Sequence, residues 1–394
     1  MYIWAMIKRE IEKELLSLCR EYPVITITGP RQSGKTTLAR MVFPDYAYCN
    51  LEHPEIRKIA TDDPKALFST YKAPLIIDEI QRVPDLLSYI QVMVDANPAK
   101  GSYILTGSNQ LSLNEAIVQS LAGRTALLTL LPLSINELRG AQIKMGRDEL
   151  ITTGFMPGVH SQMLNPFKSY RNYFQTYVER DLKQLIKVRE LSHFEDFMRL
   201  LAGRTAQVLN LYSISNDLGV SSTTLKHWLS VLEASYIVMR IYPYFENFGK
   251  RVIKSPKLLF IETGLVSYLL GIESHVQVAS HPLLGQLFEN MVIMDAIKTR
   301  YNRGEDHNIF FYRDNNRNEV DMIIKSGRNL IPVEIKSAMT FNDELVKGIR
   351  FFQKVTPDCG KGYLIYSGDL QFSKEKIEII NFNNTAAIFN GDLK

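Results

Sequence analysis

Eight consecutive residues, Gly29-Pro-Arg-Gln-Ser-Gly34-Lys35-Thr36, follow the spacing G-x-x-x-x-G-K-[ST]. The two glycines let successive backbone N–H groups, and the N-terminus of a following helix, face a phosphate group. Lys35 would neutralise the β- and γ-phosphates of a nucleotide, and the Thr36 hydroxyl would bind Mg²⁺. We therefore predict a phosphate-binding loop made of Gly29, Pro30, Arg31, Gln32, Ser33, Gly34, Lys35, Thr36 and Thr37.

A pair of acids follows a second apolar run, Leu75-Ile-Ile-Asp78-Glu79. Beside a phosphate loop, Asp78 would hold Mg²⁺ through water and Glu79 would polarise the attacking water. The alternative is an acidic pair that caps the turn from a strand to a helix. Two acids at this place favour hydrolysis of the nucleotide over binding alone.

Two further places in the chain could take part in catalysis, one as a sensor of the γ-phosphate and one as an arginine at the transition state. Tyr103 to Asn109 is an apolar strand with a polar tip, so Ser108 or Asn109, or else Thr106, could sense the γ-phosphate, unless the tip is an ordinary polar strand end. Arg124 precedes another apolar run and could stabilise transition-state charge in its own chain or in a neighbouring subunit. A surface ion pair is the alternative for Arg124.

A second set of acids lies near the C-terminus. Asp321, followed by Glu334-Ile-Lys336 on the next expected strand, is the arrangement of PD-(D/E)xK nucleases. Asp321 and Glu334 would converge on Mg²⁺, Lys336 would orient the attacking water, and Glu289 could complete the metal shell. The alternative is polar residues that alternate along half-buried strands. Seven scattered histidines and the absence of C-x-x-C predict no zinc site.

The segment Ser213 to Leu232 has the pattern of a helix-turn-helix, with Gly219 ending one helix and Ser221 or Ser222 capping the next. Two β-rich runs follow, around a plausible wing at Asn247 to Arg251. A winged helix of this kind would place four polar residues in a nucleic-acid groove and three basic ones on phosphates: Thr223, Thr224, Lys226 and His227, then Lys250, Arg251 and Lys254. Winged helices also bind proteins, so a protein partner remains open beside DNA, which we favour over RNA.

The elements that must position these residues form an α/β multidomain chain. Apolar runs at 24–28, 46–51, 74–78, 102–106 and 126–131 alternate with helix-length stretches, which predicts a parallel sheet over residues 20–135. We expect a helix at 284–300, strands at 309–313, 319–325, 330–336 and 362–366, and a linker at 266–281. The predicted domains are 1–160 for nucleotide binding, 161–270 for a helical connector and winged helix, and 271–394 for the nuclease-like tail.

The composition limits the class of protein to which the chain can belong. The chain has 394 residues, 45% of them hydrophobic, and a net charge of +4. Residues 222–257 carry that whole surplus, six basic against two acidic side chains. Three distant cysteines suit a reducing compartment, and the long apolar run from Thr125 to Asn136 is too short to cross a membrane. We expect a cytoplasmic protein without a membrane segment.

Taken together, the chain resembles a family of prokaryotic AAA-type ATPases that join a P-loop domain to a C-terminal region of unknown function. The residues that carry the resemblance span the chain: Gly29–Thr36, Leu75–Glu79 with Gln81, Ile104–Ser108, Gly123-Arg124, Leu131–Ser134, Tyr177–Asp181, Asn247–Lys257, Thr263–Leu265, Phe288–Asn290, Glu319–Asp321 and Val333–Ser337. Thr153–Pro157 departs from the pattern, which usually has two glycines there, and no arginine after the lid matches a second sensor.

The resemblance implies ATP and Mg²⁺ as cofactors, an AAA-like P-loop NTPase sheet, a winged helix and a restriction-endonuclease-like tail. The leading hypothesis is an ATPase that couples nucleotide state to nucleic-acid binding or processing. The alternative is a regulatory ATPase switch that acts on a protein partner through a non-catalytic tail. The sequence leaves oligomerisation open.

Overall fold

The computed structural model describes residues 7–108, 120–178, 191–244, 255–316, 318–356 and 359–391. Its first sheet has five strands in the order β2-β3-β4-β1-β5, and every pair of neighbours is parallel. The parallel sheet predicted over residues 20–135 is therefore confirmed, strand by strand. The strands are β1 (Val24–Thr28), β2 (Ala47–Asn50), β3 (Leu75–Asp78), β4 (Tyr103–Gly107) and β5 (Thr125–Thr129).

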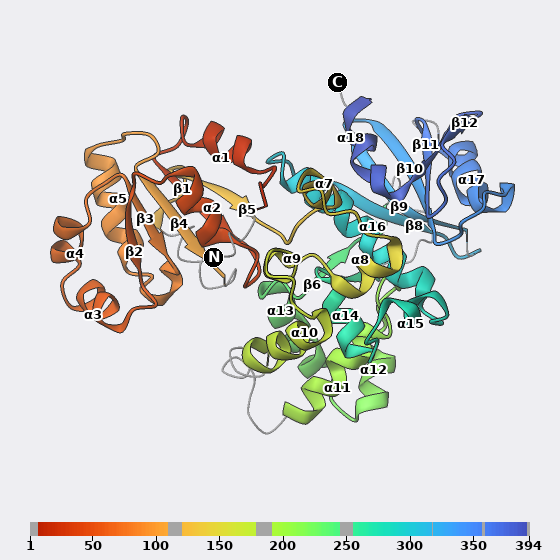
Figure 1. The fold of residues 1–394 in the computed structure, drawn as a ribbon, viewed down its shortest axis with the longest axis horizontal. Helices are drawn as coiled ribbons and strands as arrows, with labels where there is room; N and C mark the ends of the chain where they lie inside the picture. Colours follow the sequence, from red (N-terminus) through yellow and green to blue (C-terminus); the bar gives the residue numbers. More distant parts are fainter. Residues whose placement is uncertain are drawn as a thin grey trace.

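Helices cover both faces of this sheet, and the strand residues alternate between the two (Figure 1). Ile25 and Ile27 pack with α1 (Glu12–Leu18) and α2 (Lys35–Val42) on one face. Leu75 and Ile77 pack on the other face with α3 (Pro54–Asp62), α4 (Pro64–Thr70) and α5 (Leu86–Ala96). Because all five strands run in the same direction, their carboxyl ends lie along one side of the sheet. Thr28, Asp78 and Gly107, the last residues of β1, β3 and β4, therefore lie on that common side.

After β5 the chain leaves the sheet through a group of short helices. Ser134 caps α7 (Ile135–Gly140) in a capping box with Glu137, whose carboxylate accepts the backbone N–H of Ser134 at 2.8 Å. The helices α8 (Arg147–Thr153), α9 (Pro157–Ser161) and α10 (Pro166–Tyr173) follow, and a π-helical turn extends α10 over Phe174–Val178.

Three helices and a two-stranded sheet come next: α11 (Leu191–Ala202), α12 (Leu211–Leu218), α13 (Ser222–Ala234), β6 (Val238–Ile241) and β7 (Lys257–Phe260). Gly219 ends α12 with a left-handed φ of 67°, and the Ser221 hydroxyl caps α13 by accepting the N–H of Thr224. Trp228 is buried against Phe194 and Phe197. The two helices and the two strands expected here are present, the winged helix itself stays a prediction, and the expected wing lies outside the described residues.

The tail is a six-stranded mixed sheet in the order β12-β13-β11-β10-β9-β8. Helix α16 (Leu284–Tyr301) packs along it, and α17 (Lys347–Val355) covers β9 and β10. The four predicted strands correspond to β8 (Ile309–Arg313), β9 (Glu319–Ser326), β10 (Asn329–Lys336) and β11 (Gly362–Tyr366). The sequence reading missed β12 (Phe372–Lys374), β13 (Ile377–Asn381) and the terminal helix α18 (Ile388–Gly391).

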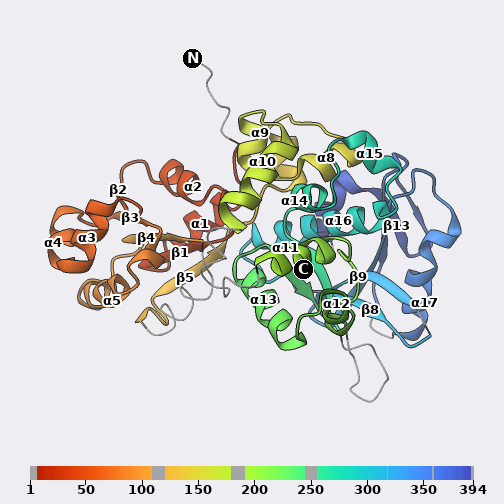
Figure 2. The ribbon, with the colours of Figure 1, turned by 90° about the horizontal axis from the view of Figure 1, so that it is seen from below.

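The linker predicted at 266–281 is wrong. These residues form most of α14 (Thr263–Leu269) and all of α15 (His275–Ala279), and both helices pack on α8. Leu269, Ile272 and Val278 are buried in one hydrophobic core, whose residues come from positions between Leu131 and Phe389. The lid helices (α7 to α10), the middle region (α11 to β7) and much of the tail thus share one core. The tail has two smaller cores besides, and the first sheet has cores of its own; Figure 2 shows the two parts side by side.

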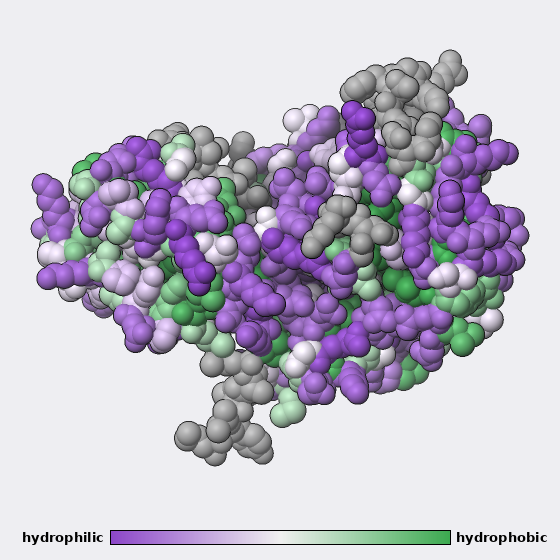
Figure 3. Space-filling model, turned by 90° about the horizontal axis from the view of Figure 1, so that it is seen from above, coloured by the Kyte–Doolittle hydropathy of each residue, from purple (hydrophilic) through white to green (hydrophobic). Residues whose placement is uncertain are grey.

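No helix among the described residues is long and apolar enough to span a bilayer. Hydrophilic side chains predominate on the face shown in Figure 3, with smaller apolar areas between them.

Candidate functional site

The phosphate loop connects the end of β1 to the start of α2, and its two glycines are required by geometry. Gly29 has a φ of 143°, and a Cβ atom there would lie 2.1 Å from the carbonyl oxygen of Leu130. Gly34 has a φ of 92° at the N-cap of α2. Side-chain-bearing residues rarely adopt either conformation, so these positions fix the wrapped backbone that a phosphate requires.

Lys35 lies inside this loop and is buried. Its Nζ donates to the carbonyl oxygens of Gly29 at 3.0 Å and Pro30 at 2.7 Å. Burial lowers the pKa of Lys35 to about 8, although Glu79 and Asp78 oppose the shift. A bound phosphate would compensate the charge of this ammonium group.

The Asp78 carboxylate accepts hydrogen bonds from three side-chain hydroxyl groups. Thr36 donates to it at 2.9 Å and Tyr48 at 2.9 Å, and Thr106 donates as well. A carboxylate next to the Thr36 hydroxyl is an oxygen donor set that fits Mg²⁺. The structure therefore brings together Thr36 and Asp78 as predicted, and it adds Tyr48, which the sequence reading missed because nothing in the motif points to β2.

Glu79 is held beside Asp78 by two neutral side chains. Its backbone is left-handed, with a φ of 59°, and its carboxylate accepts hydrogen bonds from Ser108 at 3.2 Å and from Gln81. Of the three sensor candidates, Ser108 contacts Glu79, Thr106 contacts Asp78, and Asn109 lies outside the described residues.

Arg124 lies at the opposite edge of the sheet from the loop. It precedes β5, whose Thr125 pairs with Val24 at the start of β1, about 13 Å of strand away from Thr28. Its guanidinium forms a two-pronged ion pair with Asp95, at 2.6 Å and 2.9 Å. A role of Arg124 at the nucleotide of its own chain is therefore wrong, since the strand holds it away; a role in a neighbouring subunit remains a prediction.

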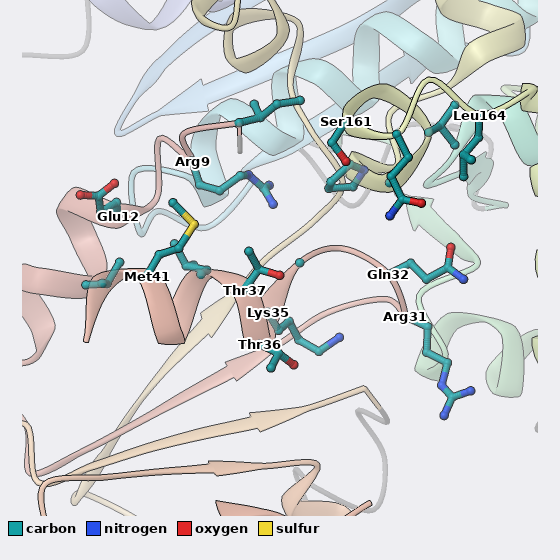
Figure 4. A pocket seen from close by; sticks show the side chains of 18 of the residues that line it. Arg9, Glu12, Arg31, Gln32, Lys35, Thr36, Thr37, Met41, Ser161 and Leu164 are labelled. Atoms are coloured by element: carbon teal, nitrogen blue, oxygen red, sulfur yellow. The ribbon is translucent and has the colours of Figure 1, made fainter. Parts of the chain in front are cut away.

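A cavity of about 810 Å³ opens over the loop (Figure 4). The loop and α2 form one wall, and α9 with the residues after it forms another. Ile7, Arg9 and Glu12 of the N-terminal segment add a third side, which the motifs alone could not locate. Six of the nine predicted binding residues line the cavity: Arg31, Gln32, Gly34, Lys35, Thr36 and Thr37.

Arg9 joins this loop to the rest of the protein. Its buried guanidinium donates to the carbonyl oxygens of Ser33 and Leu131, each at 2.7 Å, and to the carboxylate of Glu137 at 2.9 Å. Figure 4 shows Arg9 reaching toward the loop from the N-terminal segment. Arg9 could not be predicted from the sequence, because its partners lie 24, 122 and 128 residues away along the chain.

The tail contains the predicted acidic cluster on neighbouring strands β9 and β10. The Nζ atom of Lys336 lies 2.7 Å from Asp321 and 2.5 Å from Glu334. Burial works against the ionisation of both acids, but Lys336 and Lys257 lower the pKa of Asp321 to about 2, while Asp321 adds to the rise in the pKa of Glu334. Asp321, Glu334 and Lys336 thus meet as predicted.

Glu289 is placed differently from its prediction. Its carboxylate pairs at 2.7 Å with the Nζ of Lys257, and the same Nζ lies 2.7 Å from Glu319. Across the described ranges, no group of three or more histidine, cysteine or acidic side chains is arranged to hold a metal ion. Asp321 and Glu334 offer two carboxylates to one cation, and Glu289 does not complete their shell, because Lys257 already binds it.

Of the residues predicted to meet nucleic acid, Thr223, Lys226 and His227 are exposed on α13, and Thr224 is partly exposed. Lys250, Arg251 and Lys254 lie outside the described residues.

Three family models match successive parts of the chain. Residues 21–139 match an AAA domain, residues 146–276 a domain of unknown function (DUF8612) and residues 284–385 another domain of unknown function (DUF4143). Two curated relatives, the uncharacterized proteins Mb2031c of Mycobacterium bovis and Rv2008c of Mycobacterium tuberculosis, are each 29% identical over 84% of this chain and 74% of their own length.

One solved structure similar to the chain is the Walker-type ATPase PABY2304 of Pyrococcus abyssi. The two are 14% identical, the match covers 66% of this chain and 94% of that chain, and the TM-score is 0.44. A signal transduction ATPase with a tetratricopeptide repeat sensor, PH0952 of Pyrococcus horikoshii, has 15% identity, coverage of 74% and 47%, and a TM-score of 0.27. The match of residues 21–139 to an AAA domain, over the parallel sheet and the loop, supports ATP binding and hydrolysis by a P-loop ATPase domain in this chain.

Proposed function

We propose that the chain is a Mg²⁺-dependent ATPase whose nucleotide state acts on the middle region and the tail, and through them on nucleic acid. The observation that carries the ATPase is the convergence of Lys35, Thr36, Asp78 and Glu79 at one edge of a parallel sheet, beneath a cavity of about 810 Å³.

Each residue has a separate task in this proposal. Lys35 and the loop N–H groups bind the β- and γ-phosphates, and Thr36 and Asp78 hold Mg²⁺, which supplies positive charge to those phosphates. Glu79 accepts a proton from the attacking water. To reach that water, Glu79 exchanges its hydrogen bonds with Gln81 and Ser108 for one to the water, so γ-phosphate binding and release of Glu79 are linked.

Direct contacts between the loop and the shared core support coupling. The Tyr236 hydroxyl donates to Thr28, the last residue of β1 before the loop, at 2.9 Å. Arg9 bonds to Ser33 within the loop and to Glu137 beside it. A loop that moves when ATP binds therefore pulls on the middle region through Tyr236 and on the lid through Arg9.

Lys35→Ala tests the ATPase directly. The substitution removes the charge that binds the phosphates, so we expect ATP turnover to disappear in a phosphate-release assay. Lys65→Ala, on the exposed surface of α4, is the matched control and should retain full activity. Full hydrolysis by the Lys35 variant would rule out this site.

A salt titration tests the nucleic-acid part of the proposal. If Lys250, Arg251 and Lys254 contact phosphates, replacing all three by alanine should weaken duplex DNA binding and reduce the slope of log K against log salt by about 3. Parallel titrations with single-stranded RNA decide between the two nucleic acids. DNA binding that is absent or insensitive to salt would contradict this part and leave the ATPase untouched.

One observation favours a second candidate function, the regulatory switch that acts on a protein partner. Glu289, the third acid predicted for the metal shell, is already paired with the buried Lys257, which leaves two carboxylates for a metal ion, as suits an interaction domain without catalysis. Cleavage assays with Mg²⁺ or Mn²⁺ and ATP decide: cleavage that Asp321→Ala and Lys336→Ala abolish supports a nuclease, and no cleavage of DNA or RNA by the wild type supports the switch.

A further inference from the structure

Lys257 is a lysine inside the protein, with 2% of its surface exposed. It is the first residue of β7, in the middle region, yet its ammonium group reaches the acids of the tail. Nζ lies 2.7 Å from Glu289 on α16 and 2.7 Å from Glu319 on β9, and 5.2 Å from the centre of the Phe311 ring on β8. Three elements therefore close around one ammonium group.

The residue next to Glu289 fixes the other end of β7. The side chain of Asn290 accepts the backbone N–H of Phe260 at 2.8 Å and donates to its carbonyl oxygen at 2.9 Å. It also accepts the Thr205 hydroxyl at 2.9 Å. Glu289 and Asn290 thus hold the two ends of the same strand, so the position of Lys257 is set by a backbone clamp as well as by charge.

Basic side chains of the chain itself lie against each acid of the cluster, three cations for four carboxylates, with Arg313 3.7 Å from Glu319. Lys336 lies between Asp321 and Glu334, and Lys257 lies between Glu289 and Glu319. Burial of Lys257 makes it inaccessible to a substrate phosphate, so it cannot serve as a catalytic lysine in this arrangement. An isolated buried carboxylate is costly, and a fixed ammonium group at hydrogen-bonding distance relieves that cost as a metal ion would.

We propose that Lys257 is the resident cation of this cluster: its ammonium group replaces a divalent metal ion at Glu289 and fastens the middle region to the tail. A divalent ion that uses Glu289 must displace Lys257 and loosen β7 from α16. The inference needs neither ATP hydrolysis nor nucleic-acid cleavage, and it is tested on the nucleotide-free protein.

The test is thermal unfolding of the wild type and of Lys257→Met, with and without Mn²⁺ at about 1 mM. Loss of one partner of a buried ion pair should lower the Tm of the variant by about 5–15 °C. Mn²⁺ should raise the Tm of the variant by several degrees more than that of the wild type, because Glu289 becomes available only in the variant. Mn²⁺ bound at Asp78 stabilises both proteins equally and drops out of this difference.

Lys374→Met is the matched control. It removes an ion pair of the same 2.7 Å length, to Asp343, in which the lysine is 40% exposed, so neither its Tm nor its response to Mn²⁺ should change. If Lys257→Met does not fold, the double variant Lys257→Met, Glu289→Gln removes the unmatched carboxylate and should fold without Mn²⁺.

Two results would overturn the proposal. One is a Lys257→Met protein as stable as the wild type and indifferent to Mn²⁺. The other is a wild type stabilised by Mn²⁺ through Glu289, seen as loss of that stabilisation in Glu289→Gln. A double variant that also fails to fold would assign Lys257 a packing role and contradict the charge role.

Discussion

Glu79 is the acid at the nucleotide site whose position depends on other side chains. Asp78 is bonded by three hydroxyls and is well placed for a cation, whereas Glu79 is bonded by Ser108 and Gln81. This arrangement fits the two proposed tasks, with Asp78 as the ligand of Mg²⁺ and Glu79 as the group that polarises the attacking water.

Glu79→Gln should therefore lower ATP hydrolysis by about 100-fold or more, since the amide cannot accept the proton, while ATP binding stays within about twofold. Single-turnover hydrolysis and a titration with a fluorescent ATP analogue measure the two effects separately. Unchanged turnover would mean that the chain binds ATP without the catalytic role assigned to Glu79.

For single residues, prediction from the sequence succeeds where the functional residues belong to one short contiguous motif. Lys35, Thr36, Asp78 and Glu79 belong to contiguous motifs, and the structure brings them together. Arg9 and Tyr236 were missed because their partners lie 24 and 208 residues away, and no local pattern marks such pairs. Glu289 is a predicted metal ligand for the same reason: its partner Lys257 lies on another element, β7, and no local pattern links the two residues.

Among the elements, the strands of the first sheet were predictable because buried β-branched runs leave little alternative. The false linker at 266–281 has an equally physical origin. Gly271 and Ser274 have the composition of a linker, but Gly271 stands in a left-handed turn and Ser274 forms a capping box with Gln277. Residues that end one helix and begin the next resemble flexible chain when only composition is considered.

Gly154, at the end of α8 where it packs against α14, allows a prediction about thermal stability. Its φ is 65°, and a Cβ atom would lie 2.0 Å from the Glu262 carboxylate and 2.2 Å from the Tyr170 hydroxyl. Gly154→Ala should lower the Tm by about 5–15 °C through backbone strain and the clash combined.

Gly123→Ala isolates the strain. Gly123 has a φ of 75° with no atom within 4 Å of the added Cβ, so its Tm should fall by less than about 5 °C. Equal losses at Gly123 and Gly154, measured by differential scanning calorimetry, would show that the packing of α8 on α14 tolerates the extra methyl group.

On the scale of the whole molecule, the lid, the middle region and the tail share one core, so we expect them to move as one body when nucleotide binds. Arg9 connects this body to the phosphate loop through its bonds to Glu137 and Ser33. Arg9→Met should raise the Kd for ATP by about tenfold, because the Ser33 carbonyl loses a charged donor. Arg139→Met, which loses an exposed bond to the Asn383 carbonyl, should leave ATP affinity unchanged. An Arg9 variant with normal affinity would separate the loop from the lid.

The same core predicts a particular pH dependence. Burial lowers the pKa of Lys298 from 10.5 to about 8, against the opposing charges of Glu262 and Asp295. Between these two values the unfolded chain binds the proton and the folded protein does not, so the contribution of Lys298 to stability rises with pH from about 8 and is constant below.

Compared with Lys298→Met, the wild type should therefore gain Tm as the pH is raised from about 8 to 10. Thermal unfolding of both proteins across that range measures the gain. A difference in Tm that stays constant, or that moves toward the variant, would contradict the assignment.

The contacts of the N-terminal segment also set an order in time. The Glu10 carboxylate accepts one hydrogen bond from Ser134 and one from Asn302, 292 residues later, so at about 5–20 residues per second the ribosome makes Asn302 some 15–60 s after Glu10. During that interval the first sheet has left the ribosome while the segment that carries Arg9 still lacks this late partner. A newborn chain thus completes the five strands of its first sheet before the N-terminal segment beside the nucleotide cavity gains its contact with the end of α16.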